Sequence, residues 1–367
     1  MENAAKIPCD VLLHPTDEKF AENIRRFQGC PTLAVTRGGR IYMGWYAGGT
    51  REPHMENYNL LISSDDGGES WSKPILIIPS SKELLVHALD IQLWTAPDGR
   101  LFVFWVQNNT EKVKEGDTRW SVDGYVFPDM VHAEWFVVCD DPDADDPTFS
   151  EPRYMDRGFL RCKPTLLSDG SWLCCNYAQA SERYDYTVSH DGGLTFSHRS
   201  GAKKIETSFD ETMVYQKKNG DLRMMARTKF GYIAETTSHD MGETWTEAKS
   251  SGITHADSRF FVSRTPSGRI LLIYNDHPTE RTNMTLALSE DDGETWAYKR
   301  CIDTRAWISY PDADFFGDRI YLTYDRERTG EREILFASFT EDDIMDEKRP
   351  IEIKIVSKPQ RTERNGK

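Results

Sequence analysis

Four copies of one octet place aspartates at matching positions along the chain, and the chemistry of these carboxylates has to be decided first. The pattern Ser-x-Asp-x-Gly-x-(Thr/Ser)-aromatic begins at Ser64, Ser189, Ser238 and Ser289. Such aspartates can be metal ligands, catalytic acids or parts of a repeating fold. In a hairpin turn an Asp side chain accepts nearby backbone amides, Gly supplies a positive φ, and the aromatic ring packs between sheets. We interpret the octets as structural, because metal ligands must converge and turns spread around a repeating fold do not.

A second group of polar residues lies within strand-like runs, where charged side chains need partners or a wet cavity. Arg, Asp, Lys, Glu and Tyr interrupt apolar residues in the segments 24–35, 87–96, 161–168, 209–216, 258–265 and 307–315. Each segment precedes a run that begins at a turn glycine and alternates apolar residues, as a β-strand does. If the six segments line a common axis, their polar side chains are the candidates for binding and catalysis.

The elements that would position these residues repeat along the chain. Six runs begin at the turn glycines Gly39, Gly99, Gly170, Gly220, Gly268 and Gly317, and the last three octets start about 50 residues apart. A period near 50 residues is typical of a four-stranded propeller blade. The sequence therefore predicts an all-β fold, a six-bladed β-propeller of four-stranded antiparallel blades, with residues 1–367 as a single domain. Radial repetition leaves few exposed strand edges, which suits a chain of this length.

Several smaller features follow from the propeller interpretation. We expect a short lead-in over residues 1–24, with a helical turn near 16–25, and a flexible tail over 358–367. Residues 139–149 and 339–345 stand where the second and sixth blades need degenerate octets. Either the strand-like run 351–357 or the run 10–15 is expected to close the ring.

The acidic composition narrows the choice of partners. A formal net charge of −15 argues against nucleic acids and anionic membrane surfaces, because both need a basic footprint. No apolar run is long enough to span a bilayer, and the N-terminus lacks the pattern of a secretory signal, so we expect a cytoplasmic protein. The seven cysteines show no metal-ligand spacing and are expected to be reduced. The acidic run 140–146 lacks the Gly-centred spacing of calcium loops, and we expect neither a metal nor a cofactor.

The octets resemble the Asp-box of the sialidase (neuraminidase) superfamily, and six blades match the propeller of that superfamily. The resemblance covers residues from about 25 to about 344. In sialidases a Glu on an inner strand is followed by a strand that ends in a substrate-binding Arg, which here gives Glu211 and Arg227. A further Arg before an Asp-box strand corresponds to Arg281, and the catalytic Tyr corresponds to Tyr310 in the segment SYPDAD.

Other positions depart from the superfamily pattern. The segment HALDIQLW resembles an Arg-x-x-Asp segment and gives Asp90, with His87 where Arg is usual. The loop that holds the acid in sialidases reads GGTREPHMENY here, and it offers Glu52 and Glu56 where an Asp is usual. A Glu is one methylene longer than an Asp, which changes the reach of the acid.

The first arginine of the superfamily pattern is missing from its usual position. That position, two residues before a Pro, is occupied by Gly29, and Arg25 and Arg26 lie three or four residues earlier. Either a backbone bulge brings Arg26 to the site or the group of arginines that would bind a carboxylate is incomplete.

These correspondences imply a glycoside hydrolase that resembles exo-α-sialidases and cleaves a terminal sialic acid or related acidic sugar with retention. Arginine side chains bind a carboxylate through two parallel hydrogen bonds and stay charged at any working pH. A tyrosine nucleophile avoids the repulsion that a carboxylate would meet at an anomeric centre bearing a carboxylate. The resemblance therefore assigns Tyr310 as nucleophile and Glu211 as its base, with Glu52 or Glu56 as the acid.

Two alternatives stay open at this point. The protein could be a propeller glycosidase or lyase for a uronate-like or neutral sugar, which Gly29 favours, or a non-catalytic carbohydrate-binding propeller. The pairing of Glu211 and Tyr310 with an acidic loop favours an enzyme. The expected partner is a small carbohydrate or glycoconjugate, and the sequence leaves the oligomeric state open. Trp94 and Trp307 are expected to serve packing rather than to act as platforms for sugars.

Overall fold

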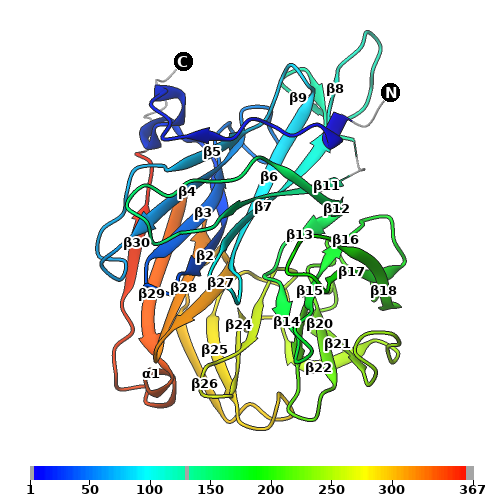
Figure 1. Ribbon diagram of the computed structural model, residues 1–367, viewed down its shortest axis with the longest axis vertical. Helices are drawn as coiled ribbons and strands as arrows, with labels where there is room; N and C mark the ends of the chain where they lie inside the picture. The colour runs from blue at the N-terminus through cyan, green and yellow to red at the C-terminus, as the bar shows by residue number, and fades with distance from the viewer. Residues whose placement is uncertain (1–3, 129–131, 361–367) are drawn as a thin grey trace.

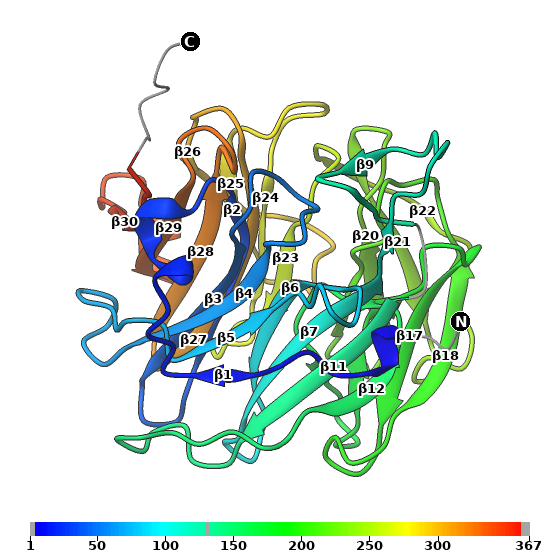
Figure 2. The same ribbon diagram turned by 90° about the horizontal axis from the view of Figure 1, so that it is seen from above.

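The computed structural model describes residues 4–128 and 132–360, and these residues form an all-β fold, as predicted. Within the described residues, six antiparallel sheets of four or five strands follow one another along the chain. Figures 1 and 2 show that the sheets succeed one another around a common centre, with the last sheet beside the first. Each sheet remains open, so neighbouring sheets are joined by packing and side-chain hydrogen bonds rather than by a continuous ladder.

The first three large sheets lie between residues 12 and 203. The first has the order β1-β5-β4-β3-β2, with β1 at Leu12–Leu13, β2 at Gln28–Val35, β3 at Ile41–Ala47, β4 at Tyr58–Ser64 and β5 at Leu76–Pro79. The second has the order β12-β11-β7-β6, with β6 at Val86–Thr95, β7 at Leu101–Asn109, β11 at His132–Cys139 and β12 at Arg153–Arg157. The third has the order β14-β15-β17-β18, with β14 at Thr165–Leu166, β15 at Trp172–Cys174, β17 at Arg183–Ser189 and β18 at Ser197–Lys203.

The last three large sheets are ordered as they occur in sequence. The fourth contains β19 (Met213–Gln216), β20 (Leu222–Ala226), β21 (Tyr232–Ser238) and β22 (Lys249–Thr254). The fifth contains β23 (Phe261–Arg264), β24 (Ile270–Asn275), β25 (Met284–Ser289) and β26 (Tyr298–Asp303). The sixth contains β27 (Ile308–Phe316), β28 (Arg319–Arg326), β29 (Glu333–Thr340) and β30 (Ile353–Ser357).

Short elements complete the described fold. A small sheet of β8 (Glu111–Lys112), β9 (Ser121–Val122) and β10 (Tyr125–Val126) is inserted between β7 and β11, and β13 (Phe159–Leu160) pairs with β16 (Asn176–Tyr177). The helical elements are the α-helix α1 (Glu341–Met345) and the 3₁₀-helices η1 (Ala4–Lys6), η2 (Glu18–Phe20) and η3 (Glu22–Ile24). The helical turn predicted near residues 16–25 is therefore present as η2 and η3. No helix among the described residues is long and apolar enough to cross a membrane.

The repeat identified in the sequence matches the strands of the large sheets. Each run that begins at a turn glycine contains the second strand of a sheet: β3, β7, β15, β20, β24 and β28. The run after Gly170 differs from the expectation of one long strand, because it divides into β15 and β16, which pair in different sheets. The four octets form the turns after β4, β17, β21 and β25, between the third and fourth strands of their sheets. The turn after β11 and helix α1 occupy the same place in the second and sixth sheets, as predicted.

The hydrogen bonds of the octets explain why their residue types recur. In the last octet Asp291 Oδ1 accepts the Thr295 amide at 2.8 Å, Asp291 Oδ2 accepts the Thr295 hydroxyl at 2.7 Å, and the Ser289 hydroxyl accepts the Gly293 amide at 2.7 Å. Gly293 has φ of 83°, and a Cβ at this position would lie 2.2 Å from the hydroxyl oxygen of Tyr215 in the fourth sheet. The octet is therefore a compact turn that allows close approach to the preceding sheet.

The aromatic residues of the octets pack between sheets. Trp71 contacts Phe336 of the sixth sheet, with ring centroids 5.4 Å apart. Trp245 contacts Tyr186 of the third sheet at 5.9 Å and donates its indole N–H to the Tyr186 hydroxyl at 3.1 Å. These two octet rings thus pack against the neighbouring sheet, as the sequence predicted.

Side-chain carboxylates join the sixth sheet to the first. Asp312 Oδ2 accepts the Leu33 amide at 3.0 Å and the Thr32 hydroxyl at 2.7 Å, and Asp314 Oδ2 accepts the Val35 amide at 3.0 Å. These bonds satisfy amides on the free edge of β2 that no strand of the first sheet can reach. Neither of the two strands expected to close the ring pairs with both the first and the sixth sheet. Strand β1 adds to the outer edge of the first sheet, and β30 is the outer strand of the sixth. The expected tail lies largely in residues 361–367, outside the described residues.

The octet geometry predicts that Asp291 contributes to stability and not to chemistry. Its hydrogen bonds lower the pKa of the Asp291 carboxyl from 3.8 to about 2. Because the folded-state pKa is depressed, the stabilisation is present above about pH 4 and is lost as the pH falls toward 2. We expect Asp291→Ala to lower the melting temperature at pH 7 and to reduce the loss of stability between pH 4 and 2.

The matched control is Glu290→Ala in the same octet. Glu290 forms an exposed ion pair with Arg269 at 3.0 Å, which should contribute little. Thermal unfolding monitored by circular dichroism from pH 7 to 2 compares the two variants. An Asp291→Ala variant that unfolds like the parent would show that the octet hydrogen bonds are not stabilising.

Candidate active site

The inner strands surround a cavity of about 520 Å³ whose walls are charged and aromatic. It is lined by Glu52, Pro53, His87, Leu89, Asn108, Phe127, Pro128, His132, Phe159, Arg161, Gln179, Ser208, Phe209, Arg281, Tyr310 and Arg328. A cavity of this volume is suited to a small ligand of a few hundred daltons. Because the lining residues come from strands and loops between Glu52 and Arg328, residues far apart in the sequence meet here.

Three inner strands carry a bulge at the position where they face the cavity. The register of β2, β6 and β27 against the next strand shifts around Cys30, Asp90 and Tyr310, respectively. Each of these three residues has a positive φ, at 55°, 49° and 58°. A bulge inserts one unpaired residue and redirects a side chain, and bulges are frequent beside functional sites. The bulges therefore turn Asp90 and Tyr310 toward the centre, out of the alternation that a regular strand would impose.

Tyr310, Glu211 and Arg227 form the buried centre of the site. The Tyr310 hydroxyl donates to Glu211 Oε1 at 2.6 Å, and Arg227 Nη1 donates to Glu211 Oε2 at 2.7 Å and to the Tyr310 hydroxyl oxygen at 3.2 Å. Desolvation alone would raise the pKa of Glu211, but Arg227, Arg161 and the Tyr310 hydroxyl outweigh it and lower the pKa to about 2. Glu211 is thus an ionised acceptor poised on the tyrosine hydroxyl.

The tyrosine itself is kept in its neutral form. Burial raises the pKa of Tyr310 above its usual value, the Glu211 carboxylate raises it further, and Arg161, Arg227 and Arg328 act in the opposite direction. The guanidinium carbons of Arg328, Arg259, Arg161 and Arg281 lie 4.2, 5.0, 5.2 and 5.4 Å from the centroid of the Tyr310 ring. Any negative charge that develops on the hydroxyl oxygen would therefore form among arginines.

Arg161 links the tyrosine centre to Asp90. Its Nη1 lies 2.6 Å from Asp90 Oδ2 and its Nη2 lies 3.3 Å from Glu211 Oε1, and all three side chains are buried. A charge buried in this way needs a partner, and here one guanidinium serves two carboxylates. The arrangement fixes Asp90 and Glu211 on one side of the cavity.

Arg328 lies against Gly29, the position where the resemblance would lead one to expect an arginine. A Cβ built on Gly29 would lie 2.6 Å from Arg328 Cγ and 2.7 Å from its Cδ, so any side chain at position 29 excludes Arg328 from its present position. Arg328 comes from the turn between β28 and β29, where its Nε lies 2.8 Å from Asp325 Oδ2. Asp325 also accepts the Cys30 amide at 2.7 Å and the Ser309 hydroxyl at 2.6 Å.

Arg281, from the loop between β24 and β25, and Arg328, from the turn between β28 and β29, meet at Ser309. Arg281 Nη1 and Arg328 Nη2 both donate to the Ser309 hydroxyl oxygen at 3.4 Å. Arg227 lies next to them through Asp257, which pairs with Arg227 Nε at 2.5 Å and whose carbonyl accepts Arg281 Nη2 at 3.1 Å. Three guanidinium groups therefore meet beside Tyr310, and the bonds of Arg281 and Arg328 to Ser309 are long enough to be exchanged for an anionic ligand.

Glu52 and Glu56, which the sequence left as alternatives for the acid, lie on different sides of the loop between β3 and β4. Glu52 lines the cavity and lies 3.4 Å from Arg328 Nη1. Desolvation and the Asp90 carboxylate raise the pKa of Glu52, while Arg328 and Arg161 oppose the shift. Glu56 is exposed on the other side of the loop and pairs with Lys82 at 3.3 Å. The structure therefore brings Glu52 to the central cluster and leaves Glu56 outside it.

The tip of this loop is fastened to the inserted β8–β10 sheet. His54 Nε2 lies 2.6 Å from Asp123 Oδ2, and the Arg51 guanidinium carbon lies 5.1 Å from the centroid of the Trp120 ring. These contacts hold the segment that carries Glu52 against the cavity.

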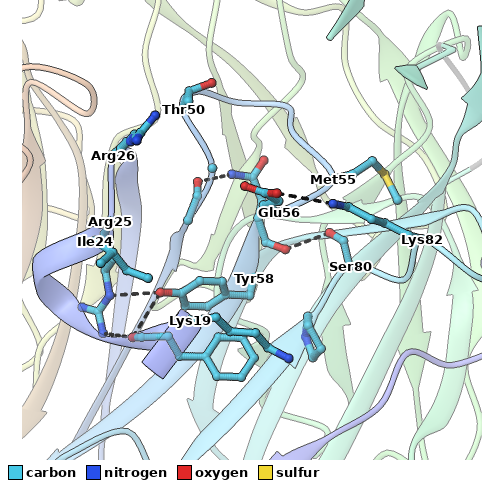
Figure 3. Close-up of a pocket in the computed structure, with 15 residues that line it drawn as sticks. Lys19, Ile24, Arg25, Arg26, Thr50, Met55, Glu56, Tyr58, Ser80 and Lys82 are labelled. Atoms are coloured by element: carbon cyan, nitrogen blue, oxygen red, sulfur yellow. Dashed lines mark hydrogen bonds and ion pairs between the residues drawn. The ribbon is translucent and has the colours of Figure 1, made fainter. Parts of the chain in front are cut away.

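Arg26 is not brought to the cavity either. It is exposed after η3 and lines a separate pocket of about 660 Å³, together with Glu56 and Lys82 (Figure 3). Its neighbour Arg25 is buried and donates to the Tyr58 hydroxyl oxygen at 3.1 Å, which gives it a structural position. The bulge in β2 lies at Cys30, after Gly29, and does not move Arg26 inward. The alternative that a bulge delivers Arg26 is thus not what the structure shows.

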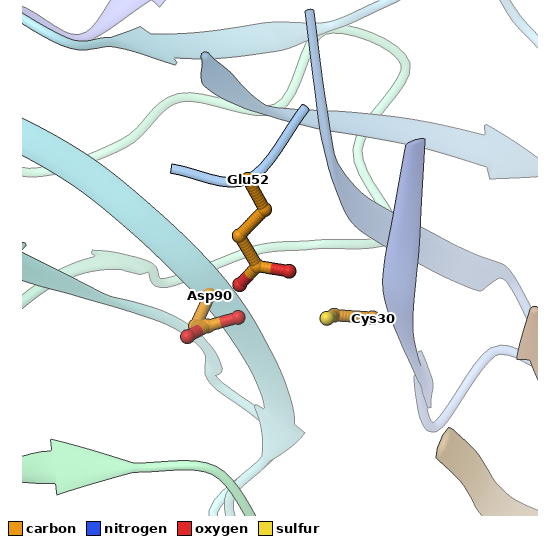
Figure 4. Close-up of side chains that lie close together, drawn as sticks. All are labelled: Cys30, Glu52 and Asp90. Carbon is orange, nitrogen blue, oxygen red and sulfur yellow. The ribbon is translucent and has the colours of Figure 1, made fainter. Parts of the chain in front are cut away.

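Cys30, Glu52 and Asp90 lie close enough to suggest a metal site. One potential ligand atom from each lies within 4.8 Å of the others (Figure 4). Arg328 and Arg161 already pair with the two carboxylates, and burial raises the pKa of the Cys30 thiol well above its usual value, which disfavours the thiolate that a metal requires. The group is better described as part of the arginine–carboxylate network.

His87 contributes a neutral wall to the cavity. Burial lowers its pKa to about 3, and its Nε2 lies 2.6 Å from the Tyr46 hydroxyl. Its ring packs edge-on against Phe127, with centroids 5.2 Å apart. His87 therefore faces the cavity from β6 as an uncharged side chain, while Asp90 on the same strand pairs with Arg161.

Sequence reasoning missed Arg161, Arg328, Asp257 and Asp325. Arg161 lies in the segment 161–168, one of the six strand-like segments with polar residues. The sequence does not show that Arg161, rather than the nearby Lys163, belongs to the site. Arg328 lies in the highly charged segment RERTGERE, where three arginines alternate with three glutamates and the sequence does not distinguish one arginine from another. The glycine at position 29 was the available signal. An anion-binding site that lacks one arginine can take an arginine from another segment, and Gly29 leaves space for it.

The six sheets, the octet turns and the central network of arginines and carboxylates define a repeat protein built around a charged cavity. The sequence profile of the BNR repeat-like domain matches residues 39–321. The chain therefore belongs to the BNR repeat-like family, and its resemblance to the sialidase superfamily, as a divergent member, is confirmed.

Solved structures with a similar fold include enzymes of known class. The NanB sialidase from Streptococcus pneumoniae is 15% identical, with a TM-score of 0.69 over 92% of this chain and 71% of that one. The intramolecular trans-sialidase from Ruminococcus gnavus is 16% identical, with a TM-score of 0.67 over 93% and 99%. A protein of unknown function from Dyadobacter fermentans is 18% identical, with a TM-score of 0.64 over 88% and 95%. At these identities the likeness establishes the fold alone. Comparison with curated proteins gave no match.

Proposed function

We propose that the protein is a retaining exo-glycosidase that removes a terminal sialic acid or related acidic sugar, and that its sheets form a six-bladed propeller of the sialidase type. The observation that carries the proposal is the 2.6 Å hydrogen bond from the Tyr310 hydroxyl to Glu211, with three guanidinium groups beside it. A buried tyrosine with only a structural role needs one hydrogen-bond acceptor for its hydroxyl, and it does not need several arginine side chains around its ring. The fold shared with solved sialidases supports the same assignment.

The first chemical step uses Tyr310 and Glu52. The Tyr310 oxygen bonds to the anomeric carbon while the glycosidic C–O bond breaks, the tyrosine proton passes to Glu211, and Glu52 donates its proton to the leaving oxygen. In the second step Glu52 takes a proton from water, the water oxygen bonds to the anomeric carbon, and Tyr310 leaves and recovers its proton from Glu211. Two inversions give net retention.

The substrate carboxylate would bind among Arg227, Arg281 and Arg328. Arg227 now donates to Glu211 and pairs with Asp257, so a carboxylate that draws part of its charge away would make Glu211 a stronger base. The Arg281 and Arg328 bonds to Ser309 at 3.4 Å are weak and are readily replaced. The acidic sugar would thereby help to activate the nucleophile that attacks it.

The first test asks whether Tyr310 is the nucleophile. Tyr310→Phe removes one hydroxyl and keeps the ring among its arginines, so we expect loss of turnover with a nearly unchanged melting temperature. The assay measures release from a panel of fluorogenic sialosides and uronides. Full activity in the variant would exclude Tyr310, and release from uronides alone would move the substrate to the alternative class.

A second test separates the two candidate acids, which lie on one loop. Glu52→Gln should lower kcat by roughly 10²–10⁴ for a poor leaving group and by less for an activated aryl glycoside. Glu56→Gln, the matched control, should behave like the parent, because Glu56 faces the other pocket. The raised pKa of Glu52 also predicts an alkaline limb of the pH–rate profile above the usual Glu range, which Glu52→Gln should abolish. Equal activity of the two variants would reject Glu52 as the acid.

A third test concerns the arginine that replaces the missing one. Arg328→Ala should lower kcat/KM by about 10–100-fold through loss of a charge-assisted contact to the substrate. Asp325 keeps the Cys30 and Ser309 bonds in this variant, so the fold should persist. Gly29→Arg in the Arg328→Ala background should recover part of the activity, whereas Gly29→Arg alone should clash with Arg328.

Arg328→Lys provides the conservative control for this pair. Lysine keeps the charge but cannot form the two-point contact, so intermediate activity is expected. Melting temperatures report whether each variant is folded. A folded double variant no more active than Arg328→Ala would show that position 29 and Arg328 do not serve the same role.

A further inference from the structure

The pocket that Arg26 lines has an excess of positive charge (Figure 3). Four of its lining residues are cationic, namely Lys19, Arg25, Arg26 and Lys82, and only Glu56 among the described lining residues is acidic. None of its described lining residues also lines the central cavity, and its volume is about 660 Å³. Because the protein as a whole carries a net charge of −15, this local excess indicates a site for an anion.

Arg25 is held at this pocket without a negatively charged partner. It is 4% exposed, and it donates from Nε to the Tyr58 hydroxyl oxygen and from Nη2 to the Phe20 carbonyl, both at 3.1 Å. Both acceptors are uncharged, since burial raises the pKa of Tyr58 above its usual value. No carboxylate of the described residues forms an ion pair with Arg25. A buried charge normally needs such a partner, so an anion on this side of the pocket would supply the missing charge.

The other cations of the pocket are also open to an anion. The Arg26 side chain is exposed and, within the part of the chain that the structure describes, has no hydrogen-bond or ion-pair partner. Lys19 pairs with Asp17 at 2.9 Å and Lys82 pairs with Glu56 at 3.3 Å, and all four of these side chains are more than half exposed. Such surface pairs contribute little, so either lysine can exchange its partner for a ligand.

The arrangement of the cations and of the apolar residues indicates the kind of anion. Figure 3 shows Arg25, Arg26 and Lys82 on different sides of the pocket, so a single anionic group does not reach all of them. Ile24 lines the same pocket and is 50% exposed, and Met55 lines it as a buried residue. A ligand that placed apolar surface against Ile24 would remove that side chain from water. The pocket therefore suits a molecule whose anionic groups are separated by an apolar body.

We propose that this pocket binds a small organic dianion, with one anionic group near Arg25, the other at the exposed cations and an apolar body against Ile24. Carboxylate and phosphate groups both present paired oxygens to a guanidinium group. The pocket lies across the β3–β4 loop from Glu52, which lines the central cavity, so the site is separate from the proposed sugar site. The inference does not depend on the proposed glycosidase activity.

The probe for this site is 4-carboxyphenyl phosphate, an aromatic ring with an anionic group at each end. Phenyl phosphate and benzoate carry the same ring with one group each. Calorimetry measures the three affinities in the Arg328→Ala background, because this substitution weakens anion binding in the central cavity. We expect the probe to bind about tenfold more tightly than either compound with one anionic group.

A charge reversal at Arg26 tests whether the probe binds in this pocket. Arg26→Glu should remove the advantage of the probe over phenyl phosphate. Lys73→Glu makes a matched charge reversal at an exposed lysine outside both pockets, and it should preserve that advantage. Melting temperatures show whether each variant is folded.

Arg25→Gln tests the buried charge. Glutamine keeps a polar side chain for the Phe20 carbonyl but removes the charge that has no counterion. We expect the probe to raise the melting temperature of the Arg328→Ala protein and to have no such effect once Arg25→Gln is added. If Arg25→Gln does not fold, the comparison of Arg26→Glu with Lys73→Glu decides.

Three results would overturn the site. They are no binding of the probe, equal affinities for the probe and phenyl phosphate, and equal weakening of the probe by Arg26→Glu and Lys73→Glu. The last result would mean that the anion responds to the net charge of the protein. Failure of the glycosidase proposal is measured separately, by turnover in the Tyr310→Phe and Glu52→Gln variants.

Discussion

The geometry of the site depends on the hydrogen bonds and the ion pair that the Asp325 carboxylate forms. It accepts the Cys30 amide of the first sheet and the Ser309 hydroxyl of the sixth, and it pairs with Arg328. One buried side chain therefore joins the two ends of the chain's repeat and places an arginine over the nucleophile candidate. Asp312 and Asp314 extend the same join along β2 through further amides. The sixth and first sheets meet through carboxylates, and the site lies at that seam.

The site is a balanced network of buried charges rather than a single ion pair. Arg161 pairs with Asp90 and Glu211, and Arg227 pairs with Glu211 and Asp257. The fully buried members, Arg161, Arg227, Asp90 and Glu211, need these partners. Such a network is rigid where its bonds are short, as around Glu211, and exchangeable where they are long, as at Ser309. An anion entering beside Tyr310 would meet guanidinium groups that are already oriented and that form only long hydrogen bonds to Ser309, which reduces the reorganisation that binding requires.

The repeat and much of the site were predictable because their signals are local. The residue types of the octets predict a tight turn by themselves, and the spacing of the turn glycines predicts the order of the strands. Glu211, Arg227, Arg281, Tyr310 and Asp90 stand at fixed distances from those markers, and the structure brings them together. The choice between Glu52 and Glu56 was not predictable, because a loop of this length can present either residue to the cavity. Arg26 was a reasonable candidate by proximity in sequence, yet the strand that follows it leads its neighbours inward and leaves it outside.

The sequence by itself determined the all-β repeat, the turns that build it and the residue types at its centre, since each depends on short-range pattern. Only the tertiary structure decided which arginine stands beside Gly29. Arg328 is almost 300 residues away in the chain, and its selection depends on the space that a missing side chain leaves when the first and last sheets meet. The bulges at Cys30, Asp90 and Tyr310 belong to the same category, because a register shift is set by the partner strand. Local pattern specifies the elements, whereas long-range packing specifies which side chains share a cavity.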